Sequence, residues 1–389
     1  METMQPALKN GRNVWDGINM PKEEFEMRMK LVRAAIAARG LDLLLVYTTG
    51  LTEYGDTAYL TNFIIRLPRG TLVAVPQKGE VVTFFEGASR GLPSLKLTLA
   101  VGELSAVGDM AKESAKYLKE KKLIPGAVGL AGLKRRMPYQ QYRTLMAELD
   151  GCAVKDADDL LAGFRMIKSV PEIDQIRRAS RIAGQLIVFL KETTFEKTGE
   201  RAIEAALYRE ARFEQAEDFR MLIARPGQAD WSFRPADSAP VAKGDNVVLY
   251  LAVEFERYWA EAIRTFTFRG ASFVEETSER LLTGPRQLCT SLKPGVTIST
   301  FCREAAALMG RKGIEALGPC GLGNGIGLGL REAPLLTEEN PGELKEGMVL
   351  SLRVASADSD KFCSMVGNTV LVGKEGGLVL TREPVRPVE

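Results

Sequence analysis

The sequence predicts two domains, an α/β domain over residues 1–165 and an α+β domain over residues 166–389. The chain has 389 residues, too many for one ordinary domain, so two hydrophobic cores are expected. In the first part, short apolar runs alternate with helical patterns, as in a sheet covered by helices. In the second part, helical segments group with long alternating runs, which is typical of antiparallel α+β folds.

The first domain is expected to begin with an amphipathic helix, because apolar residues recur at helical spacing from Pro21 until Gly40. Short apolar runs after this helix predict strands that are covered on both faces. These runs begin at Leu41, Thr71, Glu80, Leu97 and Ala127. Helical patterns over residues 107–122 and 138–149 flank the last run and complete the α/β alternation.

The second domain is expected to open with a long helix at Pro171, since proline is favoured in the first turn of a helix. Two long alternating runs, from Asn246 and from Arg257, are joined by a short polar turn and predict a β-hairpin. The remaining expected elements are helices near residues 199–215, 275–291 and 297–311, a glycine-rich loop from Gly318, and strands from Gly347 and Ser364.

Charge and composition exclude several classes of function. Lys and Arg number 52 against 50 Asp and Glu, a net charge of +2, so no strong field attracts nucleic acid or an anionic membrane. The chain contains no histidine, which excludes Ser-His-Asp and Cys-His catalysis and every metal site that uses histidine. We therefore expect a small molecule or another protein as partner.

Cysteine usage predicts a reducing compartment. The five cysteines form no CxxC pair, and their odd number leaves at least one thiol without a disulfide partner. The amino terminus lacks the apolar run of a signal peptide, and no uninterrupted apolar stretch approaches about 18 residues. We expect a cytoplasmic protein.

Several segments of the second domain occur in an order that is specific to one family. They are RMIKSVPEIDQIRRAS, GDNVVLYLAVEFERYWAEAIRTFTFRG, GNGIGLGLREAP, EGMVLSLRV and GNTVLV. In this order they resemble the pita-bread family, which includes aminopeptidase P, prolidase, methionine aminopeptidase and creatinase. In the first domain, AYLTNF from Ala58 resembles the creatinase/prolidase amino-terminal domain. The resemblance implies an α+β pita-bread domain preceded by an α/β creatinase/prolidase-type domain.

The resemblance also implies where metal ligands would lie. Peptidases of this family hold two divalent metals with two Asp, one His and two Glu. By position, those ligands correspond to Tyr250, Glu261, Asn324, Arg353 and Gly367, the last beside Asn368, and a further family histidine corresponds to Arg331. Only Glu261 keeps a carboxylate. A dinuclear centre needs several convergent oxygen or nitrogen ligands, so we expect neither a metal nor another cofactor.

The replaced ligands suggest a polar site without metal. Glu261 and Arg353 are expected to share one cavity, where Arg353 either pairs with Glu261 or binds ligand. Glu261 is also a candidate general base, and Tyr250 either a phenol donor or a structural tyrosine. Arg331 with Arg353 suits an anion.

Other residues are expected to line the same site. Asn324 and Asn368 are candidate polar contacts, and Trp231 and Phe233 either form an apolar subsite or pack in the core. Cys320 and Cys363 are expected to be inert thiols, because no histidine can activate them. The glycine-rich loop GLGNGIGLG does not follow a βαβ pattern or precede a Walker lysine, so nucleotide binding is not expected.

These observations leave two main hypotheses of function. The first is a metal-independent, creatinase-like hydrolase or lyase acting on a small carboxylate-bearing substrate. The second is a noncatalytic ligand-binding or scaffold pseudopeptidase. Overall similarity alone would suggest an Xaa-Pro peptidase. The resemblance further implies a homodimer in which Arg66 or Arg69 could reach the partner subunit's pocket.

Overall fold

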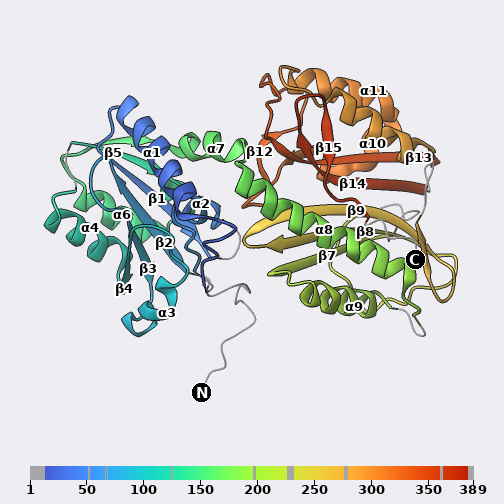
Figure 1. Ribbon diagram of the computed structural model, residues 1–389, viewed down its shortest axis with the longest axis horizontal. Helices are drawn as coiled ribbons and strands as arrows, with labels where there is room; N and C mark the ends of the chain where they lie inside the picture. Colours follow the sequence, from blue (N-terminus) through green and yellow to red (C-terminus); the bar gives the residue numbers. More distant parts are fainter. Residues whose placement is uncertain are drawn as a thin grey trace. The chain divides into compact units, whose positions relative to one another are not determined.

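The computed structural model describes residues 14–50, 53–65, 67, 69–123, 126–195, 199–225, 232–275, 279–359 and 362–383. The chain forms two compact units, Met1–Arg165 and Met166–Glu389, which Figure 1 colours from blue to green and from green to red.

The first unit is built on a six-stranded mixed sheet in the order β4-β3-β2-β1-β5-β6. Its strands are β1 (Leu43–Thr49), β2 (Gly70–Pro76), β3 (Val82–Glu86), β4 (Glu103–Val107), β5 (Ala127–Ala131) and β6 (Ala153–Asp156). Central strand β1 pairs antiparallel with β2 and parallel with β5, and its apolar residues are almost all buried. The near-continuous apolar runs therefore lie in the interior of the sheet, as expected for strands covered on both faces.

Seven α-helices accompany this sheet among the residues described for the first unit. They are α1 (Lys22–Ala38), α2 (Gly55–Thr61), α3 (Leu92–Lys96), α4 (Met110–Glu120), α5 (Leu133–Arg136), α6 (Tyr139–Glu148) and α7 (Asp158–Met166), with a 3₁₀ turn η1 (Ser89–Gly91). Helix α4 begins where Asp109 accepts a hydrogen bond from the Lys112 amide at 3.0 Å. The predicted first helix and the helices near 107–122 and 138–149 are confirmed.

One predicted strand, from Leu97, is wrong. Residues 97–101 form no strand: the Thr98 amide donates to the Leu95 carbonyl at 3.1 Å and the Leu99 amide to the Lys96 carbonyl at 3.1 Å, which continues the turn after α3. Leu99 packs against the small cluster formed by Phe63, Ile65, Phe85 and Leu104. The apolar spacing serves this cluster, and the strand begins only at Glu103, beyond Gly102.

The second unit contains an antiparallel nine-stranded sheet whose main path is β12-β11-β13-β14-β9-β8-β7. Its strands are β7 (Asp218–Ala224), β8 (Asn246–Phe255), β9 (Tyr258–Phe268), β10 (Phe273–Glu275), β11 (Gly323–Gly325), β12 (Glu332–Leu335), β13 (Val349–Ser359), β14 (Phe362–Val372) and β15 (Gly377–Val379). Strands β10 and β15 pair with β9 and β14 respectively. Helices grouped on an antiparallel sheet confirm the predicted α+β class.

The predicted hairpin is formed by β8 and β9. Its turn consists of Glu256 and Arg257, which both have positive φ, 46° and 73°. Left-handed conformations at both central residues suit the twist of a tight hairpin. In the resulting register Ala252 lies opposite Glu261 and Tyr250 opposite Ile263. Tyr250 is therefore a diagonal neighbour of Glu261 on the same face.

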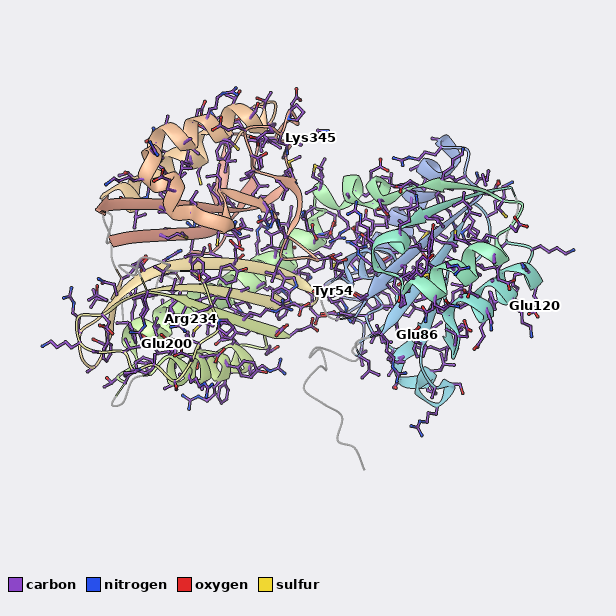
Figure 2. All side chains as sticks on the ribbon, turned by 180° about the vertical axis from the view of Figure 1, so that it is seen from behind. Tyr54, Glu86, Glu120, Glu200, Arg234 and Lys345 are labelled. Atoms are coloured by element: carbon purple, nitrogen blue, oxygen red, sulfur yellow. The ribbon has the colours of Figure 1, made fainter. Side chains whose placement is uncertain are left out.

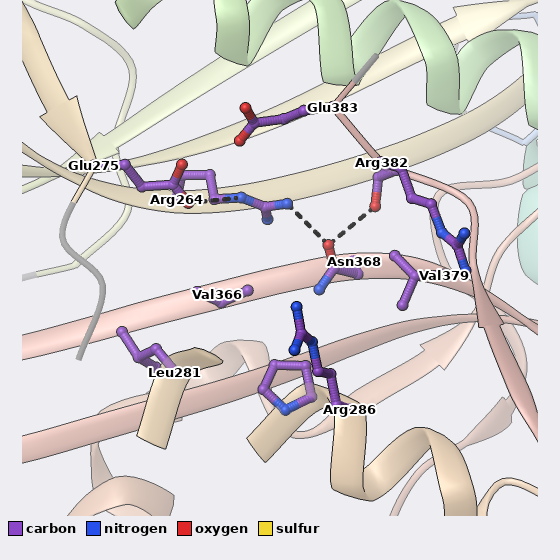
Figure 3. A pocket seen from close by; sticks show the side chains of 11 residues that line it. Arg264, Glu275, Leu281, Arg286, Val366, Asn368, Val379, Arg382 and Glu383 are labelled. Atoms are coloured by element: carbon purple, nitrogen blue, oxygen red, sulfur yellow. Dashed lines mark hydrogen bonds and ion pairs between the residues drawn. The ribbon is translucent and has the colours of Figure 1, made fainter. Parts of the chain in front are cut away.

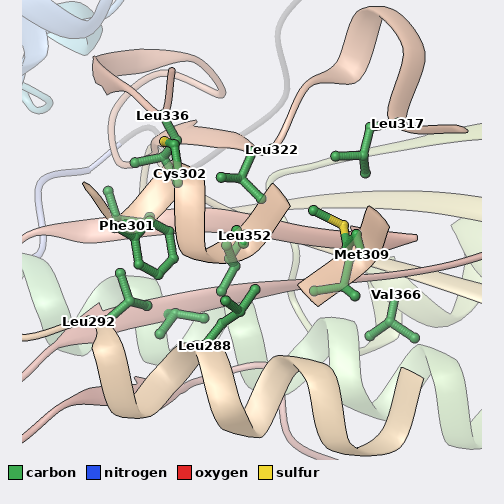
Figure 4. Packing of buried hydrophobic residues seen from close by; sticks show 14 of the residues in the cluster. Leu288, Leu292, Phe301, Cys302, Met309, Leu317, Leu322, Leu336, Leu352 and Val366 are labelled. Atoms are coloured by element: carbon green, nitrogen blue, oxygen red, sulfur yellow. The ribbon is translucent and has the colours of Figure 1, made fainter. Parts of the chain in front are cut away.

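Two apolar clusters hold the helices of the second unit against its sheet. The helices are α8 (Val170–Glu192), α9 (Glu200–Phe213), α10 (Glu279–Ser291) and α11 (Ile298–Leu317), followed by a 3₁₀ turn η2 (Gly318–Cys320). Helix α8 starts with a capping box of Ser169 and Glu172 and packs with α9 against β7 to β9. Helices α10 and α11 pack against β13 and β14, where Leu288, Phe301 and Leu352 meet (Figure 4).

No helix among the described residues is both long and apolar enough to cross a membrane. Cys289, Cys302 and Cys320 carry free thiols.

Candidate functional site

The candidate site is centred on Glu261 of β9, whose side chain is only 1% exposed. Its Oε1 accepts from Arg353 Nε at 2.9 Å and its Oε2 from Arg353 Nη2 at 3.0 Å, so the two side chains form a bidentate ion pair. The Tyr250 hydroxyl donates to Oε2 at 3.1 Å, and the Ser351 hydroxyl donates to Oε1. The predicted proximity of Glu261 and Arg353 is confirmed, and their arrangement is the paired alternative.

Strand order explains how these two residues meet. Strand β14 lies between β9 and β13, and its Gly367 pairs with both Ile263 and Arg353. A Cβ atom at Gly367 would come within 2.8 Å of the Ile263 side chain. The Ile263 side chain occupies the space above Gly367, so this position has no room for a side chain of its own.

The Arg353 guanidinium also donates hydrogen bonds to groups other than Glu261. Nη1 donates to the Cys320 carbonyl at 2.5 Å, and Nη2 donates to Asn324 Oδ1 at 3.2 Å. The Asn324 amide nitrogen in turn donates to the carbonyls of Gly325 and Leu330, at 2.8 and 3.0 Å. Asn324 therefore joins the glycine-rich loop to the ion pair, as one of the predicted site residues.

Burial controls the protonation of the neutral groups. Burial, followed by the negative charge of Glu261, raises the pKa of Tyr250 well above its ordinary value, although Arg353 opposes this shift. Tyr250 is consequently a permanent hydrogen-bond donor to Glu261. Burial also raises the pKa of Cys320, so this thiol stays protonated at neutral pH, as predicted for an inert cysteine.

A cavity of about 290 Å³ adjoins this network. Phe233 and Cys320 line it together with Ser232 and the end of α11, including Leu317. The Phe233 ring packs edge-on against the ring of Tyr250, with centroids 6.0 Å apart. Phe233 therefore belongs both to the cavity wall and to the packing around Tyr250.

One predicted site residue, Asn368, lies elsewhere, and this prediction is wrong. Asn368 pairs with Leu352, whereas its neighbour Gly367 pairs with Arg353, so Asn368 faces the opposite side of the sheet. Arg331 lies in the turn before β12 and is exposed. Arg353 pairs with Glu261, so the shared binding of one anion by Arg331 and Arg353 stays a prediction.

The remaining predicted residues divide between exposed and undescribed positions. Trp231 and Arg66 lie outside the described residues. Arg69 is exposed, and its Nη1 donates to the Glu86 carbonyl at 3.3 Å. The side chain of Cys363 is likewise outside the described part.

A network that sequence analysis did not identify anchors the segment that follows Phe233. Glu200, at the start of α9, is fully buried; it accepts from Arg234 Nη1 at 2.6 Å and from Arg225 Nε at 2.8 Å (Figure 2). The Asp237 amide donates to it at 3.1 Å. Burial opposes ionisation, but these donors prevail and lower the pKa of Glu200 to about 2. The one signal for this role in the sequence was an acidic residue at the start of a predicted helix.

The donor set does not fit a dinuclear divalent-metal centre. Among the described residues of the site, Glu261 is the one carboxylate, and its oxygens already accept from Arg353, Ser351 and Tyr250. A divalent cation there would lie beside the permanent charge of the guanidinium, which no hard-metal site tolerates without further carboxylates. Among the residues that the structure describes, no group of three or more His, Cys, Asp or Glu side chains could hold a metal.

Both units match known protein families. Residues 28–167 match the creatinase/prolidase N-terminal domain, and residues 174–374 match metallopeptidase family M24. An Xaa-Pro dipeptidase from Pyrococcus horikoshii is 26% identical over 307 residues, covering 78% of this chain and 86% of that protein. An Xaa-Pro dipeptidase from Pyrococcus furiosus is 25% identical over 295 residues, covering 73% of this chain and 84% of that protein.

Solved structures share the fold. The prolidase from Pyrococcus horikoshii OT3 superposes with a TM-score of 0.77 at 20% identity, covering 92% of this chain and 99% of that one. The X-Pro aminopeptidase from Thermotoga maritima gives a TM-score of 0.78 at 20% identity, with 92% and 98% coverage. The predicted two-domain pita-bread fold is thereby confirmed.

Proposed function

We propose a function for this chain from one premise: it belongs to metallopeptidase family M24, in the aminopeptidase P/prolidase-like group. Within that group, we infer that it is a noncatalytic binding or scaffold protein whose Glu261–Arg353 ion pair stands where its relatives would hold metals. The ion pair is the observation that carries this proposal. It links β9 to β13 across β14 through side chains alone.

The expected hydrolase or lyase is less well supported by the same contacts. A carboxylate has about four lone-pair sites. Four hydrogen bonds, from Arg353 Nε, Arg353 Nη2, Ser351 and Tyr250, occupy the Glu261 carboxylate. A general base needs a lone pair directed at the substrate proton. Glu261 would have to break a buried ion pair first, so catalysis by Glu261 and Tyr250 is disfavoured.

The first test is a peptidase assay combined with metal analysis of the full chain. We expect no hydrolysis of Xaa-Pro dipeptides above the buffer blank with added Mn²⁺, Co²⁺ or Zn²⁺, and only substoichiometric metal by elemental analysis. The Xaa-Pro dipeptidase from Pyrococcus horikoshii serves as the positive control. Hydrolysis together with a stoichiometric divalent ion would overturn the proposal.

A variant of this chain provides a matched control for the metal analysis. Arg353→Glu would replace the guanidinium by a second carboxylate beside Glu261, which is the type of ligand that divalent cations prefer. We expect this variant to retain more Mn²⁺ than the natural chain in equilibrium dialysis. Equal retention by the two proteins would show that Arg353 does not exclude metal.

The homodimer implied by the family resemblance stays a prediction. We expect light scattering of the full chain to give twice the mass of 42.7 kDa at micromolar concentration. The Arg69 side chain is exposed. The variant Arg69→Gln therefore tests whether this side chain reaches the pocket of a partner subunit. A mass of one chain at every concentration would contradict the dimer and any role for Arg66 or Arg69 in a partner subunit's pocket.

A further inference from the structure

A second, larger cavity lies on the face of the sheet opposite to the Glu261–Arg353 pair. Its volume is about 560 Å³, within the range of small-molecule sites. Figure 3 shows its floor on β9 and β14, with Arg264 and Asn368, and one wall formed by α10 with Leu281 and Arg286. The site described above makes no use of this cavity.

The floor of the cavity fixes the orientation of the Asn368 amide. Arg264, 7% exposed, donates to the carbonyls of Ile263 and Gly367 at 2.8 Å each and to Asn368 Oδ1 at 3.0 Å. The Thr381 hydroxyl donates to the same oxygen at 3.1 Å. Two donors identify this atom as the oxygen, so the amide nitrogen of Asn368 is the remaining atom and has no hydrogen-bond acceptor among the described residues.

Two arginines supply further donors without acceptors. The Arg286 guanidinium points toward the Asn368 amide across the cavity, and Arg382 lies on the wall next to it (Figure 3). Within the described ranges, neither guanidinium has an ion pair or a hydrogen bond. The Asn368 amide nitrogen and the Arg286 guanidinium thus face one space, and Arg382 lies on its wall beyond Val379. Among the described residues, none of these three groups donates to an acceptor.

The acidic residues of the rim are engaged by other cations. Glu275 pairs with Arg264 Nε at 3.1 Å and with Lys191 at 3.5 Å, and Glu383 pairs with Lys191 at 2.6 Å. Arg264 and Lys191 therefore balance the two carboxylates. The charges of Arg286 and Arg382 remain on the lining, 4 − 2 = +2, and Arg286 is the one directed at Asn368 (Figure 3).

Apolar side chains complete the lining. Leu281 and Val366 are 3% and 9% exposed, and Val379 lies beside Asn368 in Figure 3. A bare inorganic anion would leave this wall without contact. Burial of apolar ligand surface against this wall would add to the affinity.

We propose that this cavity binds a small organic anion, whose carboxylate or phosphate oxygens accept from Asn368 Nδ2, Arg286 and Arg382 and whose apolar body contacts Leu281, Val366 and Val379. Arginine suits both anionic groups because its planar fork binds two oxygens at once. The proposal is independent of the noncatalytic role of the Glu261–Arg353 pair, which faces the other side of the sheet.

The test is calorimetric titration of the full chain with benzoate, phenyl phosphate, inorganic phosphate and uncharged benzyl alcohol. We expect saturable binding of benzoate, phenyl phosphate or both, and the tighter of the two identifies the anionic group. We expect weaker binding of inorganic phosphate and none of benzyl alcohol. Equal affinity for inorganic phosphate would overturn the organic part of the proposal, and no saturable binding of any anion would overturn all of it.

Variants locate the binding. Arg286→Gln and Arg382→Gln should each raise the Kd about tenfold or more, as expected for loss of a hydrogen bond to a charged group. Lys345→Gln, at an exposed lysine of the same unit (Figure 2), removes the same charge outside the cavity and should leave the Kd unchanged. If Lys345→Gln weakened anion binding equally, the change in Kd would be due to general surface charge, and the proposed site would be contradicted.

A third variant separates binding from folding. Asn368→Asp keeps an oxygen to accept from Arg264 and Thr381 but replaces the amide donor by an anionic oxygen. We expect a folded protein, by circular dichroism, that no longer binds the anion. Unchanged binding by this variant would place the anion elsewhere.

Discussion

Replacing Arg353 by Met is expected to destabilise the second unit by about 3 to 5 kcal/mol, the typical result of leaving one charge of a buried pair without its partner. Glu261 would then be a buried carboxylate with only the Ser351 and Tyr250 hydroxyls as donors. Glu261→Gln should destabilise the unit by a similar amount. Arg353 is only 6% exposed, and the substitution leaves its guanidinium without a counter-charge. Urea unfolding followed by circular dichroism measures both changes.

The double variant distinguishes pairing from two independent effects. Glu261→Gln with Arg353→Met removes both charges together, so it should destabilise the protein by less than the sum of the single changes. The Arg311–Glu315 pair of α11 is a matched control with the same residue types, but both side chains are largely exposed. The same cycle on that pair should show little coupling. Strict additivity at Glu261 and Arg353 would mean that their close contact carries no energetic coupling.

Glu200→Gln is expected to destabilise the second unit by about 2 to 3 kcal/mol, because charge-assisted hydrogen bonds from Arg225 and Arg234 would be lost. The unfolding free energy of the natural chain should depend on pH through the same Glu200 carboxylate. The pKa of Glu200 is lowered from 4.5 to about 2 in the folded protein, so its stabilising contribution is complete above the ordinary value. That contribution is lost as the pH falls from about 4.5 toward 2.

Comparison of the two proteins isolates this effect. The difference in unfolding free energy between the natural chain and Glu200→Gln should be constant at neutral pH and shrink as the pH falls below the ordinary carboxylate range. Arg234→Gln should reproduce part of the loss, since Arg225 would still donate to Glu200 at 2.8 Å. A difference that grows on acidification would contradict the lowered pKa and the role of this network in holding the Phe233 segment.

The two networks hold different parts of the second unit. The Glu261–Arg353 pair connects β9 and β13, at positions where the family resemblance implies metal ligands, and Glu200 holds Arg234, which follows Phe233, the residue packed against Tyr250. A divalent site can be lost without loss of the fold when the repulsion of its ligands is removed with it. Here one carboxylate and one guanidinium sum to zero charge, which is compatible with burial.

The sequence by itself determined the elements with strong periodicity. The β8–β9 hairpin, the long helix that includes Pro171 and the strands around Arg353 and Gly367 follow from alternation and proline signals that act within a few residues. The ordered family segments also placed Glu261 and Arg353 in one site. Weaker patterns failed: the run from Leu97 forms a turn, and the short edge strand β7 gave too little signal to be predicted.

Tertiary structure alone decided which side chains share a space. Gly367 and Asn368 are adjacent in sequence, yet strand pairing directs one position toward Arg353 and the other toward the cavity on the opposite face. Sequence spacing could not exclude Asn368 from the Glu261 site, because a shift of one residue in register reverses every side chain of a strand. Likewise, Arg286 and Arg382, which are far apart in sequence and both exposed, line one cavity. Their juxtaposition depends on the packing of α10 against β14, a contact between distant segments that no local pattern encodes.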